Sequence, residues 1–242
     1  MGHVTPLTKS NRLEQSGQRA TDVQRSRWAL RERLIRTLKN GAKTVLPRVV
    51  TQELMEFRKY RTGERLLYLR IRFLKGIGLK NRERARPRKT ARSFLFVCFG
   101  NIIRSPMCEA LLIRALRDFP TREITVSSAG LNATPGRAAH PWAVAGAQDW
   151  SISLENHKAR LLTAEMVDRA DVIFVMDYQN QVQLLSRFPQ ASDKVFLLSA
   201  FAGKDYPHSE IHDPYYIGEE ETRRCYKTLD ACIQNLVHSL TD

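Results

Sequence analysis

Short apolar runs alternate with amphipathic stretches from residue 93 to the C-terminus. Four of the runs have the length and flanking polar residues of buried strands: SFLFVC (93–98), EITVSSAG (123–130), DVIFVM (171–176) and KVFLL (194–198). Strands alternating with helices predict an α/β fold, a four-stranded parallel sheet with helices on both faces. Ligands of such sheets bind at the carboxyl ends of the strands, and Cys98 ends the first strand.

The stretches between the predicted strands repeat apolar residues at helical spacing. Pro106 is suited to open the first of these helices, because proline fits a first helical turn. Thr163 is suited to cap the N-terminus of another. The predicted helices cover residues 106–119, a segment around Pro141, and residues 163–170, 178–188 and 219–240.

The residues before 93 follow another pattern. Residues 1–22 are polar and are predicted to be disordered. Residues 23–79 mix basic and apolar residues at helical spacing, most clearly in VQRSRWALRERLIRTLK (23–39). The segment LYLRIRF (67–73) fits a helix or an alternating strand equally well, and NRERARPRKTAR (81–92) is predicted to be a charged linker.

Charge divides the chain at the same place. The net charge is +14, but residues 1–92 hold 25 lysines and arginines against 7 acidic residues, a net +18. Residues 93–242 hold 14 against 18, a net −4. This asymmetry predicts a boundary near Arg92, with a basic, partly helical or disordered extension and linker over 1–92 and a folded domain over 93–242.

Four cysteines, without a Cys-x-x-Cys pair or metal-ligand spacing, predict reduced thiols in the cytoplasm. The sequence has no apolar run near the ~18 residues of a membrane span and no apolar signal core at its start. Pro6 stands where a myristoylation signal has serine or threonine. We therefore expect a cytoplasmic protein.

The loop after the first predicted strand, CFGNIIRSP, combines residues that suit phosphate chemistry. Loop N–H groups around Gly100 and the dipole of the following helix converge on one point and form an anion site. Such a site favours the thiolate of Cys98, to which Ser105 can donate a hydrogen bond. Arg104 offers a planar fork for phosphate oxygens. The loop thus predicts phosphoryl transfer to Cys98.

A leaving oxygen in such a reaction needs a proton donor. The segment IHDPYYIGEEE supplies Asp213 in a loop before the last predicted helix. Pro214 stiffens that loop, and Tyr215 and Tyr216 can flank a substrate ring.

Cys-x5-Arg-Ser-Pro after a first strand, with Asp-Pro-Tyr-Tyr far downstream, resembles the low-molecular-weight protein tyrosine phosphatase family over about residues 93–242. The resemblance implies a flavodoxin-like fold and hydrolysis of phosphotyrosine in protein substrates through a cysteinyl-phosphate intermediate, without metal or other cofactor. It implies that Cys98 is the nucleophile, that Arg104 binds phosphate, and that Asp213 is the general acid and then the general base.

The resemblance also implies a group of residues that bind phosphate or support the loop. Asn101, Ser105, Ser128 and His157 match a family network that shapes the loop and steadies the thiolate. The whole expected group is Phe99, Gly100, Asn101, Ile102, Ile103, Ser105, Ser128, His157, Tyr215 and Tyr216.

The sequence departs from the family in two places. Ile103 stands where the family usually has a second cysteine that traps the oxidised nucleophile as a disulfide. Cys108 is expected to face the core instead, so we expect weaker protection against peroxide. The loop LNATPG after SSAG has no aromatic residue, although many family members carry one there. Thr134 lies near that place, and Phe99 is expected to supply an apolar wall instead.

Other functions stay open. A phosphoarginine phosphatase shares the fold, but that subgroup has threonine where Ile102 stands, which favours phosphotyrosine. A thiol-dependent arsenate reductase needs further redox cysteines, and none lies between Cys108 and Cys225. A phosphatase-like adaptor without activity is disfavoured by the intact set of catalytic residues.

The basic extension has three open interpretations: a solvated tail, a segment that binds an anionic membrane surface, or a segment that docks on an acidic partner. Nucleic acid is disfavoured because the extension has no zinc finger, helix-turn-helix or repeat. Attachment to a membrane would make the cytoplasmic protein peripheral at the inner membrane surface.

Overall fold

The computed structural model describes residues 57, 60, 62–76, 87, 90–117, 123–203, 206 and 210–241. Residues Tyr60–Asp242 form one compact unit, which holds every helix and strand given below. The disorder predicted over 1–22, the helix predicted over 23–39 and most of the predicted linker lie outside the described residues. The domain boundary near Arg92 stays a prediction.

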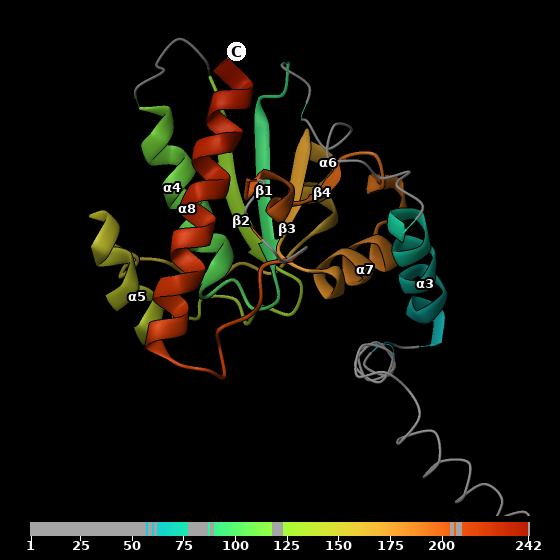
Figure 1. Cartoon of the computed structure of the whole chain (residues 1–242), viewed down its shortest axis with the longest axis horizontal. Coiled ribbons are helices and arrows are strands. Elements are labelled where there is room, and N and C mark those ends of the chain that lie inside the picture. Colours follow the sequence, from blue (N-terminus) through green and yellow to red (C-terminus); the bar gives the residue numbers. More distant parts are fainter. Residues whose placement is uncertain are drawn as a thin grey trace, which may run out of the picture. The chain divides into compact units, whose positions relative to one another are not determined.

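A four-stranded sheet lies at the centre of this unit (Figure 1). Its order is β2-β1-β3-β4, and all three pairings are parallel. The strands are β1 (Ser93–Cys98), β2 (Thr125–Gly130), β3 (Val172–Val175) and β4 (Val195–Leu197). The predicted strands and the predicted parallel sheet are confirmed, with boundaries that differ by one or two residues.

The helices that follow these strands are α4 (Arg104–Leu116), α5 (Pro141–Ala147), α6 (Ala164–Arg169), α7 (Tyr178–Arg187) and α8 (Glu219–Thr241). Single 3-10 turns cover Gln148–Trp150, Pro189–Ala191 and Leu198–Phe201. Thr163 caps α6 as predicted, since its hydroxyl accepts a hydrogen bond from the Met166 amide at 3.3 Å. The prediction that Pro106 opens the first helix is wrong by two residues. Proline is tolerated within a first turn because amides there lack helical partners.

Both faces of the sheet are covered by helices. On one face Phe94 and Phe96 are fully buried in the core shared with α4, α5 and α8, and α8 runs alongside α4 (Figure 1). Leu95 and Val97 alternate with them and are buried on the other face, the side of α6 and α7. The sheet therefore presents the carboxyl end of β1, and Cys98 with it, at one end of a closed core.

One further helix, α3 (Thr62–Gly76), precedes the sheet and packs against α7. Its structure decides between the two interpretations of residues 67–73 in favour of the helix. Tyr68 and Ile71 are buried, and the Tyr68 ring stacks on Tyr60 with centroids 4.7 Å apart. The basic extension thus contributes a helix to the compact unit.

Three of the four free cysteines lie on helices in the core: Cys108 on α4, and Cys225 and Cys232 on α8. This agrees with the prediction that Cys108 faces the core. Burial raises the pKa of Cys225 and of Cys232 from 9.0 to about 12, and burial also raises the pKa of Cys108.

These thiols predict a loss of stability in alkali. The folded chain keeps protons that the unfolded chain releases above about pH 9, so the free energy of unfolding falls as pH rises from about 9 to 12. The slope is up to about 1.4 kcal/mol per pH unit for each thiol. Urea unfolding at about pH 8 and about pH 10.5 measures it. Cys232→Ala should lose less stability between these two pH values than the wild type, and equal losses would contradict the prediction.

Candidate active site

The loop of residues 99–103 joins β1 to α4 and passes close to the end of β2. Asn101 adopts a left-handed backbone conformation with φ of 53°. Cys98 pairs with Gly130 in the sheet, and a Cβ at Gly130 would lie 2.8 Å from both the Asn101 amide nitrogen and the Gly100 carbonyl carbon. Glycine is therefore required at position 130 for the loop to take this path.

The Cys98 thiol lies at the start of α4. Its Sγ accepts a hydrogen bond from the Asn101 amide at 3.2 Å and lies 3.1 Å from the Ser105 hydroxyl. The first turn of α4 has no acidic residue, and no side chain caps its amides. The positive end of the helix dipole therefore meets no negative side chain from its own first turn, which favours an anion beside Cys98.

A network of hydrogen bonds around Asn101 supports the loop of residues 99–103. The Asn101 amide group donates to the Ser105 hydroxyl at 2.9 Å and to the Ser128 hydroxyl at 2.8 Å. The His157 ring nitrogen Nε2 lies 2.7 Å from the Asn101 carbonyl oxygen. The structure thus brings together the four residues that the sequence assigned to loop support.

Two residues of this network were not predicted. The Glu109 carboxylate accepts a hydrogen bond from the Ser128 hydroxyl at 2.5 Å and from the Arg160 guanidinium at 2.7 and 2.9 Å. The Arg160 amide donates to the Asn101 side-chain oxygen at 2.8 Å. Glu109 lies near the start of α4, and Arg160 ends the segment HKAR. Their spacing in the sequence does not indicate that they contact each other or the loop.

Arg104 is 1% exposed and is held from three directions. Its Nη1 donates to the Asp177 carboxylate at 2.7 Å and to the Ile211 carbonyl at 2.9 Å, and its Nη2 donates to the Asp213 carboxylate. Burial alone would lower the pKa of Arg104, but the neighbouring carboxylates of Asp177 and Asp213 raise it above its ordinary value. The guanidinium therefore stays charged in the buried site.

Asp177, a contact of Arg104, was also not predicted from the sequence. It lies two residues after the end of β3 and caps α7, since its Oδ1 accepts from the Asn180 amide at 2.7 Å. A polar residue at the carboxyl end of a central parallel strand was the signal that could have found it.

Asp213 is 41% exposed and lies in the loop before α8. Its Oδ1 accepts from the Tyr215 amide at 3.2 Å, and its Oδ2 accepts from Arg104. The predicted Asp213 is thus brought to the predicted Arg104 from 109 residues away in the sequence.

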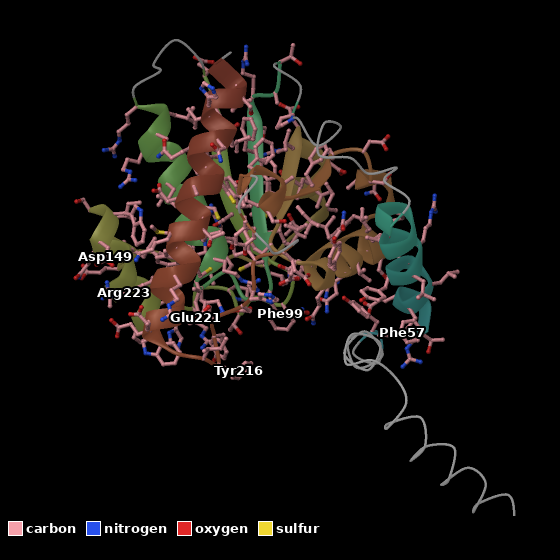
Figure 2. The ribbon with its side chains drawn as sticks, viewed as in Figure 1. Phe57, Phe99, Asp149, Tyr216, Glu221 and Arg223 are labelled. Atoms are coloured by element: carbon pink, nitrogen blue, oxygen red, sulfur yellow. The ribbon has the colours of Figure 1, made fainter. Side chains whose placement is uncertain are left out.

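Aromatic side chains lie in the loop and next to Asp213: Phe99 is in the loop, and Tyr215 and Tyr216 follow Asp213. Phe99 is 42% exposed and Tyr216 is 92% exposed, and both lie at the end of the domain where β1 terminates (Figure 2). Tyr215 is half-buried. Its ring is edge-on to the rings of Tyr216 and His140, with centroid distances of 4.7 Å and 5.4 Å.

Three other loop positions differ in exposure. Ile102 and Ile103 are buried, so their side chains pack in the core beneath the loop and are not available for contact with a substrate. Gly100 is partly exposed at the loop's surface. Thr134 is exposed.

Comparisons with known proteins agree on one family. The family model described as low molecular weight phosphotyrosine protein phosphatase matches residues 93–242. The chain is 38% identical to the probable low molecular weight protein-tyrosine-phosphatase EpsP of Ralstonia nicotianae, over 51% of this chain and 79% of that protein. It is 36% identical to the protein-arginine-phosphatase of Bacillus subtilis, over 50% and 78%. The crystal structure of the Erwinia amylovora tyrosine phosphatase AmsI superposes with a TM-score of 0.57 at 33% identity, over 63% of this chain and 95% of AmsI.

Proposed function

The chain belongs to the low molecular weight phosphotyrosine protein phosphatase family, and we propose that it hydrolyses phosphotyrosine in proteins through a cysteinyl-phosphate intermediate. The observation that carries this proposal is the position of the Cys98 thiol at the start of α4, with the Asn101 amide and the Ser105 hydroxyl beside it. An anion site with a sulfur nucleophile at its base suits transfer of a phosphoryl group to that sulfur.

In the first step, the phosphate dianion lies over the loop amides, and Arg104 neutralises its oxygens. The Cys98 thiolate attacks phosphorus, the bond to the tyrosine oxygen breaks, and Asp213 gives its proton to that oxygen. A phosphate oxygen that accepts a hydrogen bond from Arg104 Nη2 would replace the present contact with Asp213. Substrate binding would therefore release the Asp213 carboxylate from Arg104, so that it can take up a proton from solvent and then pass it to the leaving oxygen.

In the second step, water attacks the phosphorus of the cysteinyl-phosphate. Asp213, now a carboxylate, takes a proton from the water, and the sulfur–phosphorus bond breaks. The departing thiolate regains the hydrogen bonds from Asn101 and Ser105, which stabilise its charge. Inorganic phosphate leaves the loop, and Cys98 is ready for another cycle.

Asp213→Asn should lower kcat about 10²- to 10³-fold, since the amide cannot protonate the leaving oxygen or deprotonate water. The loss should grow as the leaving group becomes more basic, because a poorer leaving group depends more on the proton. Steady-state kinetics on aryl phosphates with different phenols measure both effects. Glu219→Gln, at the start of α8, is the matched control and should keep wild-type turnover. An unchanged kcat in Asp213→Asn would overturn its proposed role.

The substrate class is tested with one peptide sequence carrying phosphotyrosine, phosphoserine or phosphoarginine. We expect kcat/KM to be highest for phosphotyrosine, because the exposed rings of Phe99 and Tyr216 offer apolar contacts to an aromatic substrate. The Bacillus subtilis relative makes phosphoarginine the second candidate. Faster hydrolysis of the phosphoarginine peptide would transfer the proposal to that class.

We further propose that the basic residues 1–92 meet an anionic partner in the cytoplasm, which is either a membrane surface or an acidic protein. The net charge of +18 supports this partner, and four free cysteines support a reducing compartment. Among the residues that the structure describes, no helix is long and apolar enough to cross a membrane. Co-sedimentation of the full chain with neutral and with anionic vesicles distinguishes the two partners. Sedimentation with the anionic vesicles alone would favour the membrane surface, and sedimentation with neither would favour the acidic protein.

A further inference from the structure

Helix α7 is buried over more of its circumference than one sheet face can cover. Its buried residues are Tyr178, Asn180, Gln181, Val182, Leu184 and Leu185. At about 100° per residue these positions span roughly 200°, twice the stripe of an ordinary surface helix. α7 packs on β3 and β4, and on a second side it packs against α3. The second cover therefore comes from outside the residues that the family model matches.

The side of α3 that is buried is small and well defined. Tyr68 is 5% exposed and Ile71 is 3% exposed, one turn apart on the helix. Tyr60 is also buried, stacks on Tyr68, and accepts a hydrogen bond from the Arg65 side chain on its carbonyl at 3.0 Å. Leu66 and Leu69 lie on the exposed side, at 75% and 51%.

The N-terminus of α7 forms one wall of the arginine site. Its cap, Asp177, uses one carboxylate oxygen for the Asn180 amide of α7 and the other for Arg104. The next amide, of Tyr178, donates to the Glu210 carboxylate at 2.8 Å, and the Ile211 amide donates to the Met176 carbonyl at 2.8 Å. A shift of α7 would therefore move the carboxylate that orients the Arg104 guanidinium.

We propose that α3 is a positioning element of the active site, in which Tyr68 and Ile71 hold α7 in place and, through Asp177, fix Arg104 for phosphate. The basic extension then has two roles: its other residues meet an anionic partner, and phosphate affinity depends on α3. The inference rests on the proposed phosphate-binding role of Arg104.

The full chain carrying Tyr68→Ala and Ile71→Ala tests the inference. The inhibition constant of inorganic phosphate and the KM for p-nitrophenyl phosphate should each rise about tenfold, with a smaller change in kcat. Amide hydrogen exchange over residues 178–187 should become faster. The matched control is Leu66→Ala with Leu69→Ala, on the exposed side of the same helix, which should leave all of these values unchanged.

A double-mutant cycle with Asp177→Asn separates this route from general loosening of the fold. If α3 acts through Asp177, the α3 substitutions should weaken phosphate binding little further in the Asp177→Asn background. Additive losses, or equal phosphate inhibition in the buried-side and exposed-side variants, would overturn the inference. Ile71→Ala alone carries the same test if the double variant does not fold. A wild-type chain that hydrolyses no phosphoester would remove the proposed function, whereas unchanged exchange in α7 would remove only the role of α3.

Discussion

Cys98→Ser is expected to abolish turnover, by at least about 10⁴-fold, while the folded chain still binds phosphate. A serine hydroxyl is a far weaker nucleophile than a thiolate, and no described residue contacting Cys98 Sγ is a base that could activate it. Asp177 and the Ile211 carbonyl hold Arg104, and a serine hydroxyl can still accept the hydrogen bond of the Asn101 amide, so the anion site should remain. Hydrolysis of p-nitrophenyl phosphate and calorimetric titration with inorganic phosphate measure the two properties separately.

Cys232→Ala is the matched control for this loss, because Cys232 is a buried cysteine of α8 and has no assigned part in the chemistry. Its turnover should equal that of the wild type. Wild-type turnover in Cys98→Ser would remove the cysteinyl-phosphate mechanism. A Cys98→Ser chain without phosphate affinity would instead show that the thiol itself forms the anion site.

Arg104→Lys should lower kcat/KM about 10²- to 10³-fold, although it preserves the charge. The guanidinium reaches Asp177, Ile211 and Asp213 at once, and a single ammonium cannot make these contacts and also present a planar fork to phosphate. The variant also leaves two carboxylates in the site less well neutralised, so phosphate should meet more repulsion.

Steady-state kinetics and phosphate inhibition measure this effect, and the thermal midpoint shows whether the variant is folded. Arg114→Lys is the matched control on the same helix, where Arg114 is partly exposed and its Nη2 lies 3.6 Å from the Asp230 carboxylate. It should retain full activity. If the two variants behave alike, Arg104 does not bind the substrate phosphate.

The strands and the loop could be predicted because their signals are local. SFLFVC combines a buried run with a cysteine at its carboxyl end, and CFGNIIRSP places the nucleophile and the arginine on one turn. Asp213 was also predicted, although only its place before the last helix and the resemblance to a family pointed to it. The four loop-supporting residues were carried over from that resemblance, and the hydrogen bonds of Asn101 bring them together.

Asp177 could not be predicted as a partner of Arg104, because the contact depends on which strand ends lie side by side. The strand order β2-β1-β3-β4 places the end of β3 next to the end of β1, and no sequence period encodes that order. The same limit applied to residues 67–73. Their alternation fitted a strand and a helix. The structure forms the α3 helix, which packs against α7 and in which Tyr68 and Ile71 are buried.

Because the loop backbone comes so close to Gly130, the catalytic loop cannot be transferred to another protein by itself. The loop backbone occupies the space that any side chain at the end of β2 would need, so the two segments are shaped for each other. A protein engineer who transplants CFGNIIRSP onto another parallel sheet must also bring a neighbouring strand that ends in glycine at the paired position. Without it, the graft would carry every reactive group of the site and still misplace the amide that faces the sulfur.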